Sequence, residues 1–288
     1  MNEHYKIKLW SMLKDNMKVC KKTILGPTYG GEITKLLVLN PADEKNDYQD
    51  KYLAYSTKDK VVGIIKLPLD GNPNNTMGLI AHPSKITSIN STVDGKLFFT
   101  SGGDDLCVNM WEVDFSTLAE SFYNDPQEDP FPELLEGGPT GQVMSDLKDF
   151  FYYSQIRSKN EHTTKARKLD GKMPLEAIAN MMRSMGFYPT QKEIENMQNE
   201  IRFCKYVGQY KETVNELDFN IFLKLFVNSR PVYGISKNHI LNALSILGTI
   251  NKDEEARGEV NPKISKDELM RILSTEGEKM TVEEIKEC

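Results

Sequence analysis

The spacing of the apolar residues changes once along this chain, and that change constrains the fold more than any other feature of the sequence. Before residue 120, apolar and polar residues alternate in short runs, which is the period of a β-strand. After residue 145, the apolar residues recur every three or four positions, the period of an amphipathic helix. The stretch between them carries four prolines and three glycines, which disfavour both elements. A β part followed by an α part predicts separate domains, which we place at residues 1–120 and 145–288, with an acidic Pro/Gly linker at 121–144.

Short runs of period two, bounded by Asp, Gly, Asn and Pro, predict six strands, and Asp94-Gly95 is a tight-turn signal between two of them. The strands are Glu32–Asn40, Lys51–Thr57, Val61–Leu67, Ile86–Asn90, Lys96–Ser101 and Leu106–Val113. The helical period predicts seven helices, at Ser145–Arg157, Pro174–Met185, Thr190–Phe203, Asp218–Val227, Ser236–Leu247, Lys266–Ser274 and Thr281–Lys286. We interpret the linker as a passive connection, with docking on a partner as the alternative.

Charge, hydropathy and cysteine usage exclude several classes of protein. The net charge of -6 argues against nucleic acid as a partner, because nucleic-acid-binding domains are usually basic. No apolar run reaches the roughly 18 residues of a membrane helix, so no membrane contact is expected. The start of the chain is too charged for a signal peptide, and the four cysteines lie far apart without a CxxC pair. We therefore expect a reducing compartment, with neither a zinc ribbon nor a disulfide framework.

Residues His82–Asp114, HPSKITSINSTVDGKLFFTSGGDDLCVNMWEVD, resemble one blade of a WD-repeat propeller. The resemblance implies a chain of buried hydrogen bonds, in which His82 binds Asp105 and Ser101, and Ser101 binds the indole N–H of Trp111. A buried tryptophan needs an acceptor for its N–H, so these residue types depend on one another. The other interpretation of His82 and Asp105, a catalytic acid–base pair, lacks a nucleophile in the motif.

Earlier segments resemble weaker copies of the same repeat. Gly30–Leu69 carries Asp59 and Ile65 at the spacing of the Asp and Trp of the blade above, and Trp10 resembles the third strand of a still earlier blade. The fold class expected for the first part is therefore a set of partial WD-repeat β-propeller blades, an incomplete propeller. Because propellers need about four blades to close, we expect the missing blades from a longer chain or from another subunit.

Two segments of the second part resemble calmodulin. Met181–Ile201, MMRSMGFYPTQKEIENMQNEI, resembles the segment that joins its first two EF-hands, and Ser274–Ile285, STEGEKMTVEEI, resembles the one that joins its third and fourth. The resemblance implies an all-α calmodulin-like EF-hand domain, with Met173 and Leu217 at the hydrophobic positions of the first two loops. The fourth hand is expected to stop at Cys288, before its loop.

The calcium loops implied by this resemblance are degenerate, because calcium needs oxygen ligands at fixed positions and a glycine at the sixth. The first loop keeps only Asp170 among its ligands, and the second has Ile221 where the acidic ligand belongs. In the third, Arg257 replaces a ligand and Pro262 replaces the glycine, while four ligand positions remain oxygen-bearing. Those candidate calcium ligands are Glu259, Asn261, Ser265 and Glu268. We expect a structural domain without a metal or other cofactor, with calcium binding as the alternative.

Adaptable apolar residues of the kind that line target-helix grooves are frequent in the second part. They are Met144, Met173, Met181, Met182, Met185, Met197, Phe150, Phe203, Phe219, Phe222 and Phe226. These side chains form either such a groove or an ordinary core. The basic stretch Arg157–Lys172 is either a solvated loop or a contact with an acidic polymer surface, for which the tubulin lattice is a candidate.

The order of a WD-repeat part and a calmodulin-like part resembles the C-terminal part of the cilia- and flagella-associated protein 251 family, WD-repeat proteins of the axoneme. The resemblance implies a non-enzymatic scaffold of the calmodulin- and spoke-associated complex at the base of radial spoke 3. Such a scaffold links the spoke to the doublet microtubule and supports the regulation of dynein-driven motility. Its implied partners are the other proteins of that complex and of the spoke base, together with the doublet microtubule.

Two other classes of function compete with the scaffold. The alternative is a calcium-responsive EF-hand regulator that switches a target protein. An enzyme is not expected, because the sequence has no P-loop, no GxSxG motif and no metal-binding His pair.

Overall fold

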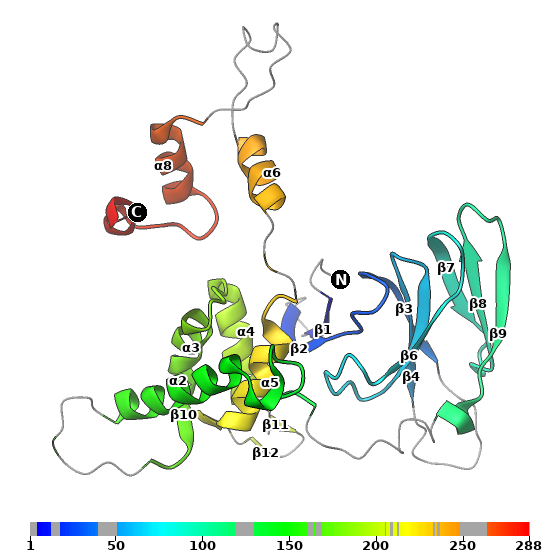
Figure 1. The fold of residues 1–288 in the computed structure, drawn as a ribbon, viewed down its shortest axis with the longest axis horizontal. Coiled ribbons are helices and arrows are strands. Elements are labelled where there is room, and N and C mark those ends of the chain that lie inside the picture. Colours follow the sequence, from blue (N-terminus) through cyan, green and yellow to red (C-terminus); the bar gives the residue numbers. More distant parts are fainter. Residues whose placement is uncertain are drawn as a thin grey trace, which may run out of the picture. The chain divides into compact units, whose positions relative to one another are not determined.

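The computed structural model of the chain describes most of its length. The described residues are 5–12, 18–39, 51–118, 130–159, 164, 169–204, 206–207, 210–211, 213–232, 234, 237–247 and 264–287. They divide into two compact units, Met1–Arg230 and Pro231–Cys288, both drawn in Figure 1. None of the described helices is long and apolar enough to cross a lipid bilayer.

Two antiparallel sheets follow one another in the larger unit. One has the strand order β3 (Ile33–Leu39), β4 (Tyr52–Thr57), β5 (Val61–Lys66), β6 (Thr76–Ile80), and the other has the order β7 (Ile86–Ser91), β8 (Leu97–Gly102), β9 (Val108–Glu112). Every residue of β4 is buried, as expected of an inner strand with both faces covered. The two sheets share one core, formed by Leu39, Tyr52, Ala54, Val62, Ala81, Ile86, Phe98, Val113 and Leu118.

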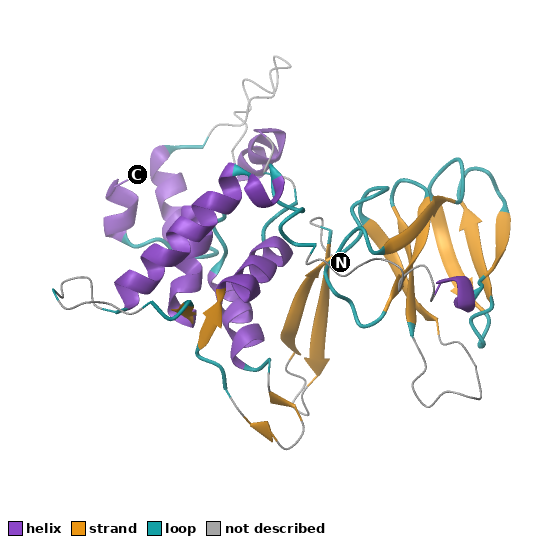
Figure 2. Cartoon of the chain, turned by 60° about the horizontal axis from the view of Figure 1, so that its bottom comes forward, coloured by secondary structure: helices purple, strands orange, loops and turns teal. Residues whose placement is uncertain are grey.

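The remainder of the larger unit is helical, with short strands between the helices (Figure 2). Its elements are η1 (Gly138–Thr140), α2 (Gln142–Ser158), β10 (Lys172–Pro174), η2 (Leu175–Ala177), α3 (Ile178–Ser184), α4 (Gln191–Arg202), β11 (Tyr206–Val207), β12 (Tyr210–Lys211), β13 (Glu216–Asp218) and α5 (Phe219–Ser229). α4 begins with a capping box between Thr190 and Glu193. Asp218 caps the N-terminus of α5, because its carboxylate accepts the backbone N–H of Ile221.

The core of the helical part is built around the short pair of strands β10 and β13. Met173 lies opposite Leu217 in this pair, and both side chains are fully buried. Most of the methionines and phenylalanines considered for a groove are core residues here: Met144, Met173, Met181, Met182, Met197, Phe222 and Phe226 are buried. Of that set, Phe150 and Phe203 are exposed, at 38% and 47%, and Met185 and Phe219 are half-buried. The structure therefore favours the core over the groove for these residues.

The first hairpin of the chain is separate from both larger sheets. It consists of β1 (Lys6–Met12) and β2 (Lys18–Leu25), which pair with each other only. Lys6 is the partner of Leu25 and Trp10 is the partner of Cys20, with a bulge between Leu9 and Trp10. β2 lies against α4 and α5 of the helical part (Figure 1).

The smaller unit contains three described helices, α6 (Lys237–Leu247), α8 (Lys266–Thr275) and α9 (Val282–Glu287). Ser265 caps the N-terminus of α8, because its hydroxyl accepts the backbone N–H of Glu268. α6 is rich in apolar residues, yet none of its residues is buried. Its large apolar side chains are therefore solvent-exposed within the described structure.

The predicted fold class, partial WD-repeat β-propeller blades followed by an all-α calmodulin-like EF-hand domain, is wrong. The described strands form separate antiparallel sheets of two, three and four strands, which do not close into a propeller. The second part is not all α, because β10 to β13 lie between its helices. The local sequence pattern predicts strands and turns, but it does not predict which element packs against the apolar face of each sheet, and that packing determines the fold. The predicted order, a β part and then an α part, agrees with the structure.

Each predicted strand and helix overlaps an observed one, but β2 and β6 in the first part and β10 to β13 in the second were not predicted. β2, KVCKKTIL, has adjacent lysines that break the alternation of a half-buried strand. β6, TMGLI, contains Gly78, where an added Cβ would lie 3.0 Å from the Tyr55 hydroxyl oxygen, and a glycine inside a strand weakens the strand pattern. Residues 121–129 of the predicted linker lie outside the described residues.

Candidate functional site

The β1–β2 hairpin is fastened to the helical part through the backbone of β2. The Thr23 N–H donates to Oε2 of Glu200 on α4, over 3.1 Å. The Leu25 N–H donates to Oδ1 of Asn228 on α5, over 3.0 Å, and Asn228 is only 2% exposed. Side-chain acceptors thus take the place of the next strand along the edge of the hairpin. Burial raises the pKa of Glu200, and the bond from Thr23 partly offsets that rise.

Lys6 adds a third bond to the same contact. Its ammonium group donates to the carbonyl oxygen of Val227 over 3.2 Å, and the residue is 6% exposed. Burial, with the nearby Arg230 guanidinium as the second cause, lowers the pKa of Lys6 to about 7. We call this set of contacts, Lys6, Thr23 and Leu25 with Val227, Glu200 and Asn228, the hairpin joint.

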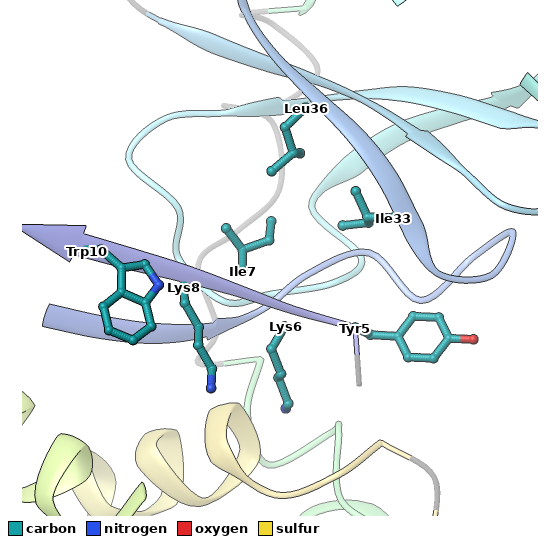
Figure 3. A pocket seen from close by; sticks show the side chains of 7 residues that line it. All are labelled: Tyr5, Lys6, Ile7, Lys8, Trp10, Ile33 and Leu36. Atoms are coloured by element: carbon teal, nitrogen blue, oxygen red, sulfur yellow. The ribbon is translucent and has the colours of Figure 1, made fainter. Parts of the chain in front are cut away.

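The opposite face of β1 contacts the four-stranded sheet. Figure 3 shows the Ile7 side chain directed toward Ile33 and Leu36 of β3, while Lys6 and Lys8 point the other way. Ile7 and Leu36 pack against the small core cluster of Ile33, Tyr55 and Ile65. A cavity of about 380 Å³ lies between β1 and β3. The hairpin therefore contacts the sheet on one face and the helices on the other.

The segment that leads into α2 also packs on α5. Phe131 and Leu135 are buried, and the ammonium group of Lys224 lies 5.0 Å from the centre of the Phe131 ring. The Arg230 guanidinium donates to the carbonyl oxygen of Leu134 over 3.1 Å. Burial lowers the pKa of Arg230, and the Glu136 carboxylate opposes that effect. Residues 131–135 thus cover the C-terminal half of α5.

A second polar cluster lies on the three-stranded sheet. Nδ1 of His82 is 2.7 Å from Oδ2 of Asp105, and Nε2 of His82 is 2.8 Å from Oγ1 of Thr100. The indole N–H of Trp111 donates to the same Thr100 hydroxyl oxygen over 3.0 Å. His82 and Thr100 are buried at 2% and 0% exposure. The cluster gives hydrogen-bond partners to the buried His82 and Thr100 and to the half-buried Trp111, which is a structural role.

The hydroxyl in this cluster belongs to Thr100, and the prediction of Ser101 for that position is wrong. Successive side chains of a strand point to opposite faces, so a shift of one residue moves a hydroxyl from the core to the other side. Ser101 faces outward, where its hydroxyl lies 2.9 Å from that of Thr87. The hydrogen bond from His82 lowers the pKa of Asp105, which keeps that carboxyl ionised.

The candidate calcium ligands are only partly within the described structure. Glu259 and Asn261 lie outside the described residues. Ser265 caps α8, and Glu268 forms a bidentate ion pair with Arg271 at 2.7 and 2.9 Å. Among the residues that the structure describes, no group of three or more His, Cys, Asp or Glu side chains could hold a metal ion.

The basic stretch Arg157–Lys172 is described at its two ends. Lys159 pairs with Asp170 over 2.8 Å, and Asp170 also accepts the backbone N–H of Lys172. The ion pair with Lys159 is the main cause of the lowered pKa of Asp170. Asp170, the one ligand left in the first predicted loop, is therefore engaged with its neighbours.

Sequence reasoning missed the residues of the hairpin joint. Glu200 and Asn228 each occupy a polar position on the otherwise apolar buried stripe of a helix, three residues after Met197 and Leu225 respectively. A polar residue on such a stripe needs a buried partner, and this signal was available in the sequence. Lys6 carried no comparable signal, because a lysine in a short strand is usually solvated.

These contacts define a protein in which sheets, a hairpin and helices are fastened by buried polar bonds. The CFAP251 C-terminal domain family matches residues 142–288. The chain is 63% identical over its full length to cilia- and flagella-associated protein 251 of Tetrahymena thermophila, and 37% and 36% identical to the proteins of that name from Mus musculus and Pongo abelii. The chain belongs to the cilia- and flagella-associated protein 251 family, and is accordingly a protein of cilia and flagella.

The matched region is a minor part of each relative. This chain spans 30% of the length of the Tetrahymena protein, 21% of the mouse protein and 24% of the Pongo protein. Its full length is covered in all three alignments, so the segments that form the sheets and the helices here both have matching sequence in these relatives.

Proposed function

We propose that this chain is a non-enzymatic scaffold segment of the ciliary axoneme, in which the sheets and the helices act as one piece. The observation that carries the proposal is the hairpin joint. Three bonds to α4 and α5, accepted by the buried Val227 and Asn228 and the half-buried Glu200, hold the hairpin whose other face packs on β3. A scaffold needs such fixed connections, because a load on one part must reach the other without unfolding the segment between them.

Exposed apolar side chains on the outer strands support a role in assembly. Met77 and Ile80 on β6 are 54% and 64% exposed, and Val108 and Met110 on β9 are 69% and 65% exposed. Apolar residues gathered on edge strands mark surfaces that other chains cover. Enzyme chemistry has less support, because the buried His82 cluster satisfies its own polar atoms.

More specifically, we propose that the scaffold belongs to the calmodulin- and spoke-associated complex at the base of radial spoke 3. There it links the spoke to the doublet microtubule and supports the regulation of dynein-driven motility. The support is the membership of the ciliary family and the combination of sheets and helices in one segment. The partners are then other proteins of that complex and of the spoke base, and the microtubule wall.

The test is a deletion of residues 145–288 from the full-length protein in a ciliate that lacks its own copy. We expect the spoke-base complex to be lost from isolated axonemes after a salt wash, as measured by quantitative mass spectrometry and by tomography of the spokes. A full-length protein carrying Lys192→Glu, on an exposed position of α4, is the matched control. Normal spokes with partners retained at full level in the deletion strain would contradict the scaffold.

A calcium-responsive regulator is the second candidate. It is favoured only by the oxygen-bearing positions Glu259, Asn261, Ser265 and Glu268. Titration calorimetry of the chain with calcium separates the two candidates, since a regulator must bind the ion with measurable heat.

A further inference from the structure

A groove runs along the outer side of the helical part, between α2 on one wall and η2 with α3 on the other. Its volume is about 500 Å³. Its lining does not include the residues of the hairpin joint, and Met181 is the one buried core methionine that it does include. Both walls belong to the same compact unit, and α2 and α3 are in contact.

The residues on both walls have helical spacing. α2 contributes Phe150, Ser154 and Arg157, which are four and three positions apart. α3 and the turn before it contribute Ala177, Asn180 and Ser184, which are three and four positions apart. Residues at these spacings form a row along one side of a helix. The groove therefore runs between two such rows for about two helical turns, roughly 10 Å.

The small side chains of this groove leave room for another helix, and the hydroxyl groups of two of its serines are already hydrogen-bonded within the chain. The Ser158 hydroxyl donates to the carbonyl oxygen of Gln155 over 2.9 Å, and the Ser184 hydroxyl donates to that of Met181 over 2.8 Å. A helix can therefore cover both serines without leaving their hydroxyl groups unpaired. Phe150, at 38% exposure, and Tyr153, at 50%, supply the apolar and aromatic surface against which such a helix would pack.

The charged side chains around the groove favour a negatively charged ligand. Arg157 and Arg183 both line it and are exposed, and Glu176 is the carboxylate among its lining residues. Neither guanidinium has an ion-pair partner among the described residues. Arginine binds carboxylates in a planar, two-pronged geometry, which makes it the usual cation at such contacts.

We propose that this α2–α3 groove docks an amphipathic helix of another protein, with acidic residues beside its apolar face. The apolar face covers Phe150 and Tyr153, and the carboxylates pair with Arg157 and Arg183. This is helix-in-groove recognition, read through apolar anchors three and four residues apart. The inference goes beyond the proposed scaffold and does not depend on it, because it names a surface and the chemistry of its ligand.

The test uses the full chain and two synthetic helical peptides of 16 residues, matched in their leucine face. One carries glutamates along both flanks and the other carries lysines at the same positions. Binding is measured by fluorescence anisotropy at low salt. We expect the acidic peptide to bind about tenfold more tightly than the basic one, a difference of about 1.4 kcal/mol.

Two variants and a control locate the binding in the groove. The double variant Arg157→Glu with Arg183→Glu should reverse the preference between the two peptides, and Asn180→Trp should abolish binding by filling the groove. Lys192→Glu reverses one charge on α4, outside the groove, and should leave the preference unchanged. Circular dichroism melting of each variant separates a filled groove from a failed fold.

Three results would overturn the inference. One is equal binding of both peptides, and another is a charge-reversal variant that keeps the preference for acid. The third is a concentration-dependent dimer of the chain, seen in sedimentation and abolished by Asn180→Trp, because a second copy would then be the occupant.

Discussion

The backbone N–H of Leu25 donates to the side-chain oxygen of Asn228, which lies 203 residues further along the chain. The amide of Asn228 is buried against Gly71, where an added Cβ would come within 2.6 Å of Oδ1. Gly71 has a φ of 90°, a backbone conformation that only glycine adopts without strain. One buried side chain therefore contacts both the hairpin and the loop between β5 and β6.

Replacing that side chain should weaken the larger unit. Asn228→Leu leaves the Leu25 N–H buried without an acceptor, which costs about 1–3 kcal/mol. We expect a lower unfolding midpoint in thermal or urea denaturation followed by circular dichroism. Asn220→Leu, at an exposed position on the same helix, is the control and should change stability by less than about 0.5 kcal/mol. Equal midpoints for the two variants would argue against the hairpin joint.

The buried Lys6 predicts a pH dependence of stability. Its pKa is lowered to about 7 in the folded chain, against 10.5 for the ordinary side chain. Between these values the unfolded chain binds more protons at this residue, so stability should rise with pH by up to about 1.4 kcal/mol per unit. Below pH 7 the charge is present in both states, and the folded chain carries the whole cost of burying it.

The variant Lys6→Met isolates this effect. We expect the difference in unfolding free energy between Lys6→Met and the parent chain to change steadily from pH 7 to 10, in favour of the parent as pH rises. Lys8→Met, on a less buried neighbour of the same strand, should show no such trend. A constant difference across that range would mean that Lys6 is charged and solvated in the folded chain.

The His82 cluster predicts opposite results for two adjacent residues. Thr100→Val keeps the shape of the side chain but removes the oxygen shared by His82 and Trp111. It should cost about 1–3 kcal/mol, mainly because the buried Nε2 of His82 is left without a partner. Ser101→Ala removes an outward hydroxyl and should cost less than about 1 kcal/mol. The melting temperatures of the two variants test this. A larger loss of stability for Ser101→Ala than for Thr100→Val would mean that Ser101, and not Thr100, supplies the hydroxyl of the cluster.

Calcium is expected to leave the chain unchanged. Adding calcium at millimolar concentration should not alter the melting temperature, because Arg257 and Pro262 disrupt the third predicted loop and Glu268 is paired with Arg271. Scanning calorimetry with and without a chelator measures this. A calcium-dependent rise of several degrees that Glu268→Gln abolishes would favour the regulator over the scaffold.

Much of the fold could be predicted from the sequence because periodicity is a local property. The alternation around Tyr52–Thr57 and the turn at Asp94-Gly95 involve neighbouring residues only, and they predicted strands and a hairpin where the structure has them. The prediction of Ser101 in place of Thr100 was wrong by one residue because it depends on a property that is not local. The face to which a side chain of β8 points is fixed by the register of that strand against β9.

The hairpin joint could not be predicted in the same way. It joins backbone groups of β2 to side chains about 180 to 200 residues away, and backbone groups are identical whatever the sequence. Only the acceptor side chains can be recognised in the sequence, because they are polar residues on the apolar stripes of α4 and α5. The sequence could therefore have marked Glu200 and Asn228 as residues in need of a partner, but not the partner itself.

The long separation within the hairpin joint has a consequence during synthesis of the protein. A ribosome that adds about 5–20 residues per second makes β2 roughly 10–40 seconds before α5. During that interval the nascent hairpin has neither Glu200 nor Asn228 to accept its backbone N–H groups, and its edge is open to pairing with other strands. The adjacent lysines Lys21 and Lys22 break the alternation of β2. During synthesis, however, their charges oppose pairing of the open edge with other strands, and so protect the nascent hairpin from aggregation.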